Sequence, residues 1–269
     1  MSEPTDSSLS GHAGSVHTRV WHRSQPVRTV ILVHGFGEHI GRYDHVAAAL
    51  VAGGATVWGL DHAGHGRSEG ERGFISDLDA AVGDLKLLVD AARQAHPDLA
   101  IVMVAHSMGG AIGLRYAELH PDDLAGLVVS APLIGSWMPV RVLLALDDLP
   151  EIPVDPSTLS RDPAVAEAYA ADPLVYHGPF QRATLAAAGN GLLDIALDAD
   201  RVTIPVLWQH GSDDQLVPVD GTRRGVALLD NAVVQERIYA GARHEIFNET
   251  NRDEVLADTA AFVASVAPG

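Results

Sequence analysis

The sequence predicts an α/β protein in which a mostly parallel central sheet is flanked by helices and interrupted by an inserted helical cap. Three observations lead to this fold class. Short apolar runs alternate with helical patterns through the first half of the chain, the same alternation returns near the C-terminus, and a proline-rich segment lies between the two. With 269 residues, the chain is long enough for one large domain with such an insertion.

The composition narrows the classes of function. The chain has 35 acidic and 18 basic residues, and its formal net charge of −17 repels nucleic-acid backbones and anionic lipid head groups. We therefore expect no nucleic-acid partner, and any contact with a lipid surface has to be apolar. The chain has no cysteine, which excludes disulfides, thiolate metal sites and a cysteine nucleophile.

Strands and helices alternate over residues 16–131, the first part of the expected core, after a loose polar leader at residues 1–15. Residues 27–34 are a continuous apolar run, typical of a strand covered on both faces, and Gly53 and Gly54 end the helix before the next strand. The expected strands are residues 16–23, 27–34, 55–60, 101–104 and 124–130, and the expected helices are residues 43–52, 75–96 and 108–120.

The alternation breaks over residues 132–201, which we expect to form the inserted cap. This segment has no clear buried strand, and short apolar helices are expected at residues 140–146 and 185–197. Prolines interrupt it at Pro139, Pro150, Pro153, Pro156, Pro163 and Pro173. The second part of the core, residues 202–269, resumes the pattern with strands at residues 205–210 and 233–239 and helices at residues 219–229 and 253–266.

The run from Ala100 to Gly113 combines an apolar strand, a sharp turn at Ser107 and a helix that begins with small residues. A serine at such an elbow projects its hydroxyl above the carboxyl edge of a parallel sheet, where the N–H groups and positive dipole of the helix point at the same place. Ser107 is therefore a candidate nucleophile. The alternative is a serine that only caps a buried helix, and Ala105 stands where the usual elbow motif has glycine.

Two later loops supply an acid and a base. A serine hydroxyl becomes nucleophilic when a histidine takes its proton and a carboxylate orients that histidine. Asp213 and Asp214 follow one late strand and His244 follows the next, so these loops and the elbow meet at one edge of the sheet, in the chain order of hydrolases with an elbow serine. Either aspartate is suited to cap the next helix instead, and an isolated loop histidine is more often a surface residue.

Ester cleavage through a serine also needs two N–H donors for the negative charge that develops on the carbonyl oxygen. The backbone N–H of Met108, directly after the candidate nucleophile, is one candidate. The N–H of Phe36 is the other, because it lies between Gly35 and Gly37 after the first long apolar strand. Those glycines are also compatible with a tight turn alone.

Together, these motifs resemble the monoacylglycerol lipase family of α/β-hydrolases. The segments that carry the resemblance are HGFGEHIGRYDHVAAAL, DHAGHGRSEG, AHSMGG, SAPLIG, HGSDDQLVP and GARHEIFNE, and the cap segment SRDPAVAEAYAADPLVYHG resembles bacterial members. The resemblance implies the α/β-hydrolase fold and cleavage of monoacylglycerols to fatty acid and glycerol through an acyl-enzyme. It places the nucleophile at Ser107, the acid at Asp214, the base at His244 and the oxyanion amides at Phe36 and Met108.

The resemblance also implies that Glu38 and Arg42 help to hold the glycerol end of the substrate. Mammalian members have a further histidine three residues after the catalytic one, and Phe247 stands there in this chain. The change to Ala105 at the elbow is small, and we expect it to preserve activity. The alternative within enzymes is a carboxylesterase or lysophospholipase of the same fold, which releases a different alcohol. Outside enzymes, the alternative is a catalytically silent binding module.

The remaining expectations concern cofactors, the cap and location. We expect no cofactor and no metal, because the resemblance makes the loop of Asp61, His62 and His65 a scaffold. We expect apolar cap residues to form a lid that lines an acyl tunnel and makes transient contact with lipid surfaces; they are Trp137, Met138, Val140, Val142, Leu143, Leu144 and Leu146. The absence of a signal-peptide pattern favours a cytoplasmic protein, peripheral to a membrane at most, with export by another route as the alternative. The sequence leaves the oligomeric state open.

Overall fold

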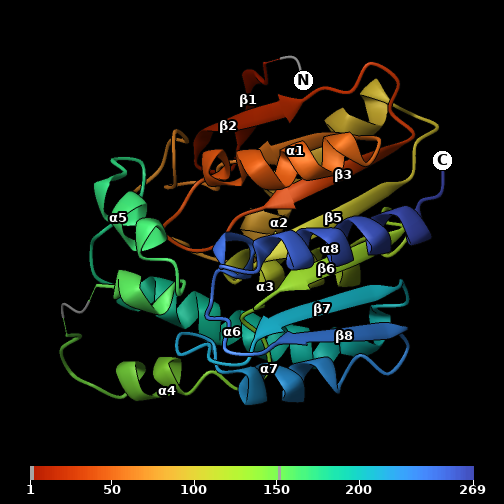
Figure 1. Cartoon of the computed structure of the whole chain (residues 1–269). Helices are drawn as coiled ribbons and strands as arrows, with labels where there is room; N and C mark the ends of the chain where they lie inside the picture. Colours follow the sequence, from red (N-terminus) through yellow and green to blue (C-terminus); the bar gives the residue numbers. More distant parts are fainter. Residues whose placement is uncertain (1–2, 151–152) are drawn as a thin grey trace.

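The centre of the molecule is one eight-stranded sheet with the strand order β1-β2-β4-β3-β5-β6-β7-β8 (Figure 1). The computed structural model describes residues 3–150 and 153–269. All neighbouring strands from β4 to β8 are parallel, and β1 and β2 are antiparallel to their neighbours. The strands are β1 (Thr5–Gly11), β2 (Gly14–Trp21), β3 (Arg28–Val33), β4 (Ala55–Leu60), β5 (Ile101–His106), β6 (Gly126–Ser130), β7 (Val206–Gly211) and β8 (Val234–Tyr239). The predicted fold class is confirmed.

Helices cover both faces of this sheet. α1 and α8 pack on one face, and α2, α3 and α7 pack on the other, where α6 lies against α2 and α3. The α-helices are α1 (Asp44–Ala52), α2 (Leu78–Ala95), α3 (Met108–Leu119), α4 (Met138–Leu144), α5 (Pro163–Ala171), α6 (Arg182–Asp198), α7 (Val219–Val226) and α8 (Arg252–Val266). Short 3-10 turns are η1 (Ile40–Tyr43), η2 (Pro156–Thr158), η3 (Ala199–Arg201) and η4 (Ile246–Asn248).

The prediction of a loose leader over residues 1–15 is wrong, because Thr5–Gly11 forms the edge strand β1. It pairs with β2 along its whole length through a turn at Gly14, whose φ of 119° suits glycine. His12 fixes the turn to α2: its backbone N–H donates to Asp84 Oδ1 at 2.8 Å, and its ring Nδ1 lies 2.8 Å from Asp84 Oδ2. The polar composition misled the prediction, since an edge strand held by backbone hydrogen bonds needs few apolar side chains.

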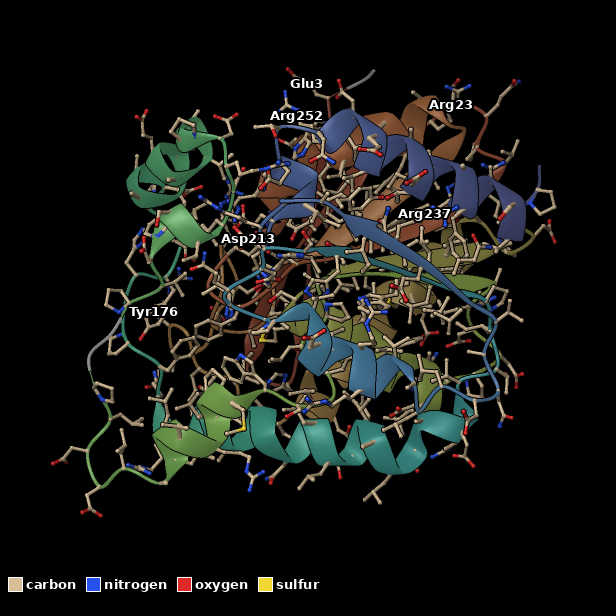
Figure 2. All side chains as sticks on the ribbon, turned by 60° about the horizontal axis from the view of Figure 1, so that its bottom comes forward. Glu3, Arg23, Tyr176, Asp213, Arg237 and Arg252 are labelled. Atoms are coloured by element: carbon tan, nitrogen blue, oxygen red, sulfur yellow. The ribbon has the colours of Figure 1, made fainter. Side chains whose placement is uncertain are left out.

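The opposite edge strand, β8, is polar for a related reason. Its central residues Gln235, Glu236 and Arg237 are exposed, and Arg237 lies on the outer surface in Figure 2. Charged side chains on an edge strand oppose pairing with strands of other chains. Both edges are therefore polar, whereas the central strands are fully buried.

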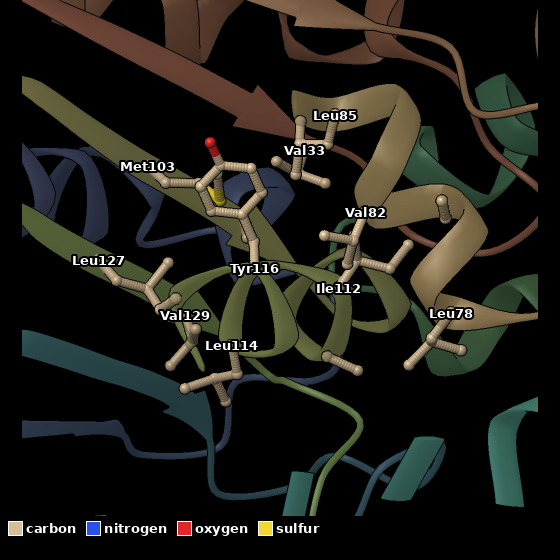
Figure 3. Packing of buried hydrophobic residues seen from close by; sticks show 14 of the residues in the cluster. Val33, Leu78, Val82, Leu85, Met103, Ile112, Leu114, Tyr116, Leu127 and Val129 are labelled. Atoms are coloured by element: carbon tan, nitrogen blue, oxygen red, sulfur yellow. The ribbon is translucent and has the colours of Figure 1, made fainter. Parts of the chain in front are cut away.

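Side-chain alternation along the central strands builds two cores. In β3, Val30 and Leu32 belong to the core next to α1 and α8, whereas Ile31 and Val33 belong to the core next to α2 and α3. Figure 3 shows the second core, where side chains of α2 and α3 pack together with strand residues such as Met103. Burial of each such side chain contributes about 1.5–3 kcal/mol. This packing holds α3, the helix that follows Ser107.

The segment between β6 and β7 contains α4, α5 and α6, and lies outside the sheet (Figure 1). α4 and α6 fall where apolar helices were expected, and α6 packs against both α3 and α4. α5 was not expected from the sequence, although Asp162 and Pro163 are a signal for a helix start: Asp162 Oδ1 accepts the Ala164 N–H at 3.0 Å, and proline occupies the first helical position. We retain residues 132–201 as a proposed cap, with residues 151–152 outside the described range.

Candidate active site

Ser107 occupies a strained turn between β5 and α3. Its φ of 55° and ψ of −120° are unusual for a residue other than glycine, and strain of this kind is typical of an elbow nucleophile. The turn needs small residues close by: a Cβ added to Gly109 would lie 2.4 Å from the carbonyl oxygen of His34. The strand-turn-helix expected around Ser107 is therefore present, with the glycine that its close approach requires.

Ala105, which replaces the usual first glycine of the elbow, is accommodated from the helix side. Its methyl group points toward Gly113 of α3, and a Cβ added to Gly113 would lie 3.1 Å from the Cβ of Ala105. That distance is shorter than ordinary van der Waals contact. Because position 113 has no side chain, the methyl group of Ala105 fits there, and the helix still starts close to the strand.

Three loops bring a hydroxyl, an imidazole and a carboxylate together at the carboxyl ends of β5, β7 and β8. His244 Nε2 lies 2.9 Å from Ser107 Oγ, and His244 Nδ1 lies 2.7 Å from Asp214 Oδ2. The imidazole therefore bridges the other two side chains, one at each ring nitrogen. This arrangement is suited to moving a proton from the serine to the histidine while the carboxylate orients the ring.

Of the two neighbouring aspartates, the structure brings Asp214 into this constellation. Its side chain is fully buried, and its Oδ1 accepts the backbone N–H groups of Leu216 and Val217, each at 2.9 Å. Asp213 is exposed and lies at the surface in Figure 2. The turn after β7 therefore brings Asp214, and not Asp213, next to His244.

The charges of the constellation support one another. Burial alone would raise the pKa of the Asp214 carboxyl, but the charge of His244 and hydrogen bonds from His210 and His244 outweigh burial and hold this pKa well below its ordinary value. Burial alone would lower the pKa of His244, but the Asp214 carboxylate beside it raises that pKa above its ordinary value. Asp214 is therefore ionised near neutral pH and stabilises a proton on His244.

Phe36 and Met108, the two candidate oxyanion residues, line the same cavity as Ser107. Met108 is the first residue of α3, so its N–H is one of the free donors at a helix N-terminus. The loop of Phe36 passes close to the nucleophile: a Cβ added to Gly35 would lie 3.1 Å from the Cβ of Ser107. The ring of Phe36 stacks on Phe180 of the proposed cap at 4.9 Å between centroids.

The cavity above Ser107 has a volume of about 370 Å³ and is mainly apolar. Most of its apolar lining comes from the proposed cap, namely Leu133, Trp137, Pro139, Leu143, Leu149, Pro150, Pro153, Val154, Leu159, Tyr169, Phe180 and Leu185. The indole N–H of Trp137 donates to the carbonyl oxygen of Leu216 at 2.9 Å, which ties the start of α4 to the loop that carries Asp214. An apolar cavity of this kind is suited to a hydrocarbon chain.

A buried charged group lies at one side of this cavity. Arg42 Nη1 donates to Glu38 Oε2 and to Glu245 Oε1, and Arg42 Nη2 donates to Glu245 Oε2, each at 2.7 Å. Burial alone would raise the pKa of Glu245, but Arg42 outweighs burial and lowers that pKa to about 2; burial keeps the pKa of Glu38 above its ordinary value despite Arg42. Glu38 and Glu245 line the cavity, and Arg42 does not belong to its described lining.

Phe247, the departure noted from the sequence, is buried and packs against Tyr43, with ring centroids 6.5 Å apart. It does not belong to the described lining of the main cavity. Two buried residues near the constellation were not predicted: His210, which bonds Asp214, and Glu245, which lines the cavity and pairs with Arg42. Both had a positional signal, because Glu245 directly follows His244 and His210 ends the strand before the Asp214 turn.

The loop of Asp61, His62 and His65 packs beneath the site as part of the fold. Asp61 accepts the backbone N–H groups of Ile40 and Arg67, at 2.7 and 2.8 Å, and so connects two loops. Over residues 3–150 and 153–269, no group of three or more His, Asp or Glu side chains is arranged to hold a metal ion.

The sequence and the fold are similar to those of known hydrolases. A family model described as "Serine aminopeptidase, S33" matches residues 24–251. The chain is 40% identical to a monoacylglycerol lipase of Mycolicibacterium smegmatis over 90% of both chains. It is also similar to the crystal structure of Paleococcus ferrophilus monoacylglycerol lipase, with a TM-score of 0.81, 28% identity and coverage of 94% of this chain and 99% of that one.

A third similarity is to a thermostable carboxyl esterase from Bacillus coagulans solved in complex with glycerol, with a TM-score of 0.86, 25% identity and coverage of 99% of both chains. Each of these three matches covers at least nine tenths of this chain, and the family model extends from residue 24 to residue 251. The chain therefore belongs to the monoacylglycerol lipase family of α/β-hydrolases, a family of carboxylic ester hydrolases.

Proposed function

We propose that this protein hydrolyses monoacylglycerols to fatty acid and glycerol, with Ser107 as nucleophile, His244 as base and Asp214 as the acid of a triad. The observation that carries the proposal is the position of the His244 imidazole, 2.9 Å from Ser107 Oγ and 2.7 Å from Asp214 Oδ2, at an apolar cavity. The similarity to monoacylglycerol lipases over nine tenths of the chain supports the substrate class.

The reaction follows from these contacts. Ser107 Oγ attacks the ester carbonyl carbon while its proton passes to His244 Nε2, and Asp214 stabilises the imidazolium. The carbonyl oxygen becomes negative and accepts N–H bonds from Phe36 and Met108. The ester C–O bond then breaks, and the proton on Nε2 passes to the leaving oxygen of glycerol. Water attacks the acyl-serine in the same way, with His244 as base, and releases the fatty acid.

The two ends of the substrate have different surroundings in the cavity. We assign the acyl chain to the apolar part formed with the cap, because transfer of each buried CH₂ from water contributes about 0.8 kcal/mol. We assign the glycerol hydroxyls to Glu38 and Glu245, because both residues line the cavity and a carboxylate accepts hydrogen bonds. Arg42 helps to hold the glycerol end indirectly in this scheme, because it fixes both carboxylates.

The cap has an outward apolar face, and we assign it to transient contact with lipid surfaces. Met138, Val142 and Leu146 are spaced four residues apart and are 55%, 54% and 42% exposed. Val140 and Leu143 point the other way, since Val140 is buried and Leu143 lines the cavity. Apolar contact fits the net charge of −17. No helix within the described residues has the length and hydrophobicity needed to cross a membrane.

A carboxylesterase with a different alcohol leaving group is the second candidate, favoured by the similarity to the Bacillus coagulans carboxyl esterase. The paired carboxylates Glu38 and Glu245 disfavour a lysophospholipase, because their negative charge repels a phosphate group at the alcohol end.

The test combines a covalent probe with a substrate panel. A fluorophosphonate probe should label Ser107, and the label should vanish in Ser107→Ala while the protein remains folded. Rates should be highest on monoacylglycerol when compared with diacylglycerol, lysophospholipid and p-nitrophenyl esters. Labelling with a preference for p-nitrophenyl esters would favour the carboxylesterase. A folded protein without labelling would contradict the proposal and point to a binding module.

A further inference from the structure

We infer that His210, at the end of β7, is a positioning residue that fixes the acid of the catalytic triad by donating a hydrogen bond to Asp214. The inference rests on the proposed function, because it concerns the same triad. His210 is completely buried and lies four residues before Asp214, on the strand that leads into the acid turn. It does not line the described cavity, so it acts through Asp214 rather than on substrate.

The protonation of His210 follows from its neighbour on the strand. Trp208 Nε1 lies 3.1 Å from His210 Nδ1 and is buried with it. An indole nitrogen donates and never accepts, so His210 Nδ1 must accept this hydrogen bond and carries no proton. The proton of the neutral ring is therefore on Nε2. The tautomer is set by a contact on the side of the ring away from the active site.

His210 Nε2 faces two acceptors. It lies 2.8 Å from the carbonyl oxygen of Val217 and 3.1 Å from Asp214 Oδ2, so one N–H is shared between them. The Asp214 oxygen that receives it is the same Oδ2 that bonds His244 Nδ1 at 2.7 Å. The opposite tautomer would direct a nitrogen lone pair at the carboxylate. The hydrogen bonds from Nε2 to Asp214 Oδ2 and to the Val217 carbonyl oxygen would then both be lost.

Asp214 is thereby held at both oxygens. Oδ1 accepts two backbone N–H groups, from Leu216 and Val217, and Oδ2 accepts from His210 and His244. The three donors other than His244 hold the carboxylate in one rotation without help from His244. Oδ2 therefore stays in line with His244 Nδ1. Preorganisation of this kind matters because misplacement of a catalytic group by about 1 Å can cost about 100-fold in rate.

A purely structural role for His210 has to be distinguished from the positioning of Asp214. The ring of His210 also packs edge-on against Trp208, with centroids 5.9 Å apart, so loss of the side chain is expected to destabilise the protein whatever its role in catalysis. A test must therefore separate the donor to Asp214 from the acceptor for Trp208. Two substitutions do so, because an asparagine amide reaches the position of Nδ1 and a glutamine amide reaches the position of Nε2.

The experiment compares His210→Asn and His210→Gln in the full-length protein, on a monoacylglycerol with a short, soluble acyl chain. His210→Asn keeps an acceptor near Trp208 and loses the donor to Asp214. We expect its kcat to fall about ten-fold, the effect of one lost hydrogen bond to a charged group, with KM unchanged within two-fold. His210→Gln keeps the donor, and we expect its kcat within about three-fold of the unmodified protein.

The pH profile is the readout that packing does not change. Without the His210 donor, more negative charge remains on Asp214 Oδ2, which stabilises the imidazolium of His244 and raises its pKa. The acid limb of kcat/KM should therefore move to higher pH in His210→Asn and stay in place in His210→Gln. Gln209→Met is the matched control, since Gln209 is equally buried on β7 but donates to Tyr239, away from the triad. It should lower Tm without changing kcat.

A measurement on the unmodified protein covers the case in which the variants fail to fold. In a ¹⁵N-histidine NMR spectrum, His210 should carry its proton on Nε2 and none on Nδ1, whether or not the protein is active. A proton on Nδ1 would overturn the inference, as would equal kcat values and acid limbs in the Asn and Gln variants. Failure of the proposed function looks different, because the unmodified protein itself would then turn over no ester.

Discussion

The carboxyl edge of the sheet, where the parallel strands end, and the cap form two sides of one cavity in different ways. At the edge, Ser107 and Asp214 follow the buried parallel strands β5 and β7, His244 follows the parallel edge strand β8, and hydrogen bonds of 2.7 to 2.9 Å join the three side chains. Across the cavity, side chains such as Leu143 and Phe180 contribute apolar surface. Proton transfer depends on direction and distance, whereas hydrocarbon binding depends on area and shape. The edge should therefore tolerate little change, and the cap considerably more.

The sharpest test of this contrast is a substitution that keeps shape and removes charge. Asp214→Asn should lower kcat by about 10⁴-fold, because the amide no longer selects the productive His244 tautomer or stabilises the imidazolium. Asp213→Asn is the matched control, one residue away and exposed. Its kcat should stay within two-fold. Steady-state kinetics on a soluble ester measure both, and equal losses in the two variants would contradict the assignment of the acid.

Substitutions that strain the backbone at the carboxyl edge should be tolerated as poorly as substitutions that remove its charges. Gly109→Ala places a Cβ 2.4 Å from the carbonyl oxygen of His34 and should lower the free energy of unfolding by about 3 kcal/mol. In Gly83→Ala the new methyl meets nothing within 4 Å on α2, and better helix propensity should stabilise the protein by up to about 1 kcal/mol. Urea denaturation of both variants measures the difference. A neutral Gly109→Ala would mean that the elbow is looser than described.

Changes on the outer face of the cap should have small effects that depend on the substrate. Met138→Asp with Val142→Asp should slow hydrolysis of long-chain monoacylglycerol in zwitterionic vesicles by about five-fold, equivalent to about 1 kcal/mol of lost interfacial binding. Hydrolysis of a soluble short-chain ester should not change. Val233→Asp, at an exposed site before β8 and 70% exposed, is the control. If all three substitutions act alike on vesicles, the cap has no special contact with lipid.

The smallest expected effect is on pH dependence. His244 must be neutral to accept the Ser107 proton, and Asp214 raises the pKa of His244 above its ordinary value of 6.5. Activity should therefore rise with pH, and the midpoint of the acid limb of kcat/KM should lie above 6.5. Asp214 stays ionised over this range because its own pKa is lowered. A midpoint clearly below 6.5 would mean that another charge dominates the His244 environment.

The carboxyl edge of the sheet, with its loops, was predicted from the sequence better than the rest of the molecule for a physical reason. The buried parallel strands β5 and β7 contain apolar runs, so the loops after them, with Ser107 and Asp214, could be placed from the sequence. The strand before His244, β8, is a polar edge strand, and its place followed from the alternation of strands and helices. The choice of Asp214 over Asp213 depends on which carboxylate meets the Leu216 and Val217 N–H groups, and a local pattern does not encode that. It came from the family resemblance, which also suggested Glu38 and Arg42.

Elements that depend on contacts distant in the sequence were missed. β1 is polar and forms a hairpin with the next strand, β2; the contact that is distant in the sequence is the one to Asp84 of α2, which holds the turn. Glu245 gains its place from a bidentate pairing with Arg42, and the two residues are about 200 positions apart. The roles of the triad, the oxyanion amides and the glycerol contacts stay predictions until the variants are measured.

The contact between Ala105 and Gly113 ties the evolutionary histories of two positions together. With alanine at 105, a methyl group at 113 would be crowded by the Ala105 methyl at 3.1 Å; with glycine at 105 that contact would be absent, and Met103 Sδ at 3.2 Å would be its nearest neighbour. The effect of a substitution at either position thus depends on the residue at the other. An alanine at the elbow is therefore accommodated more easily when the facing position of the helix has no side chain.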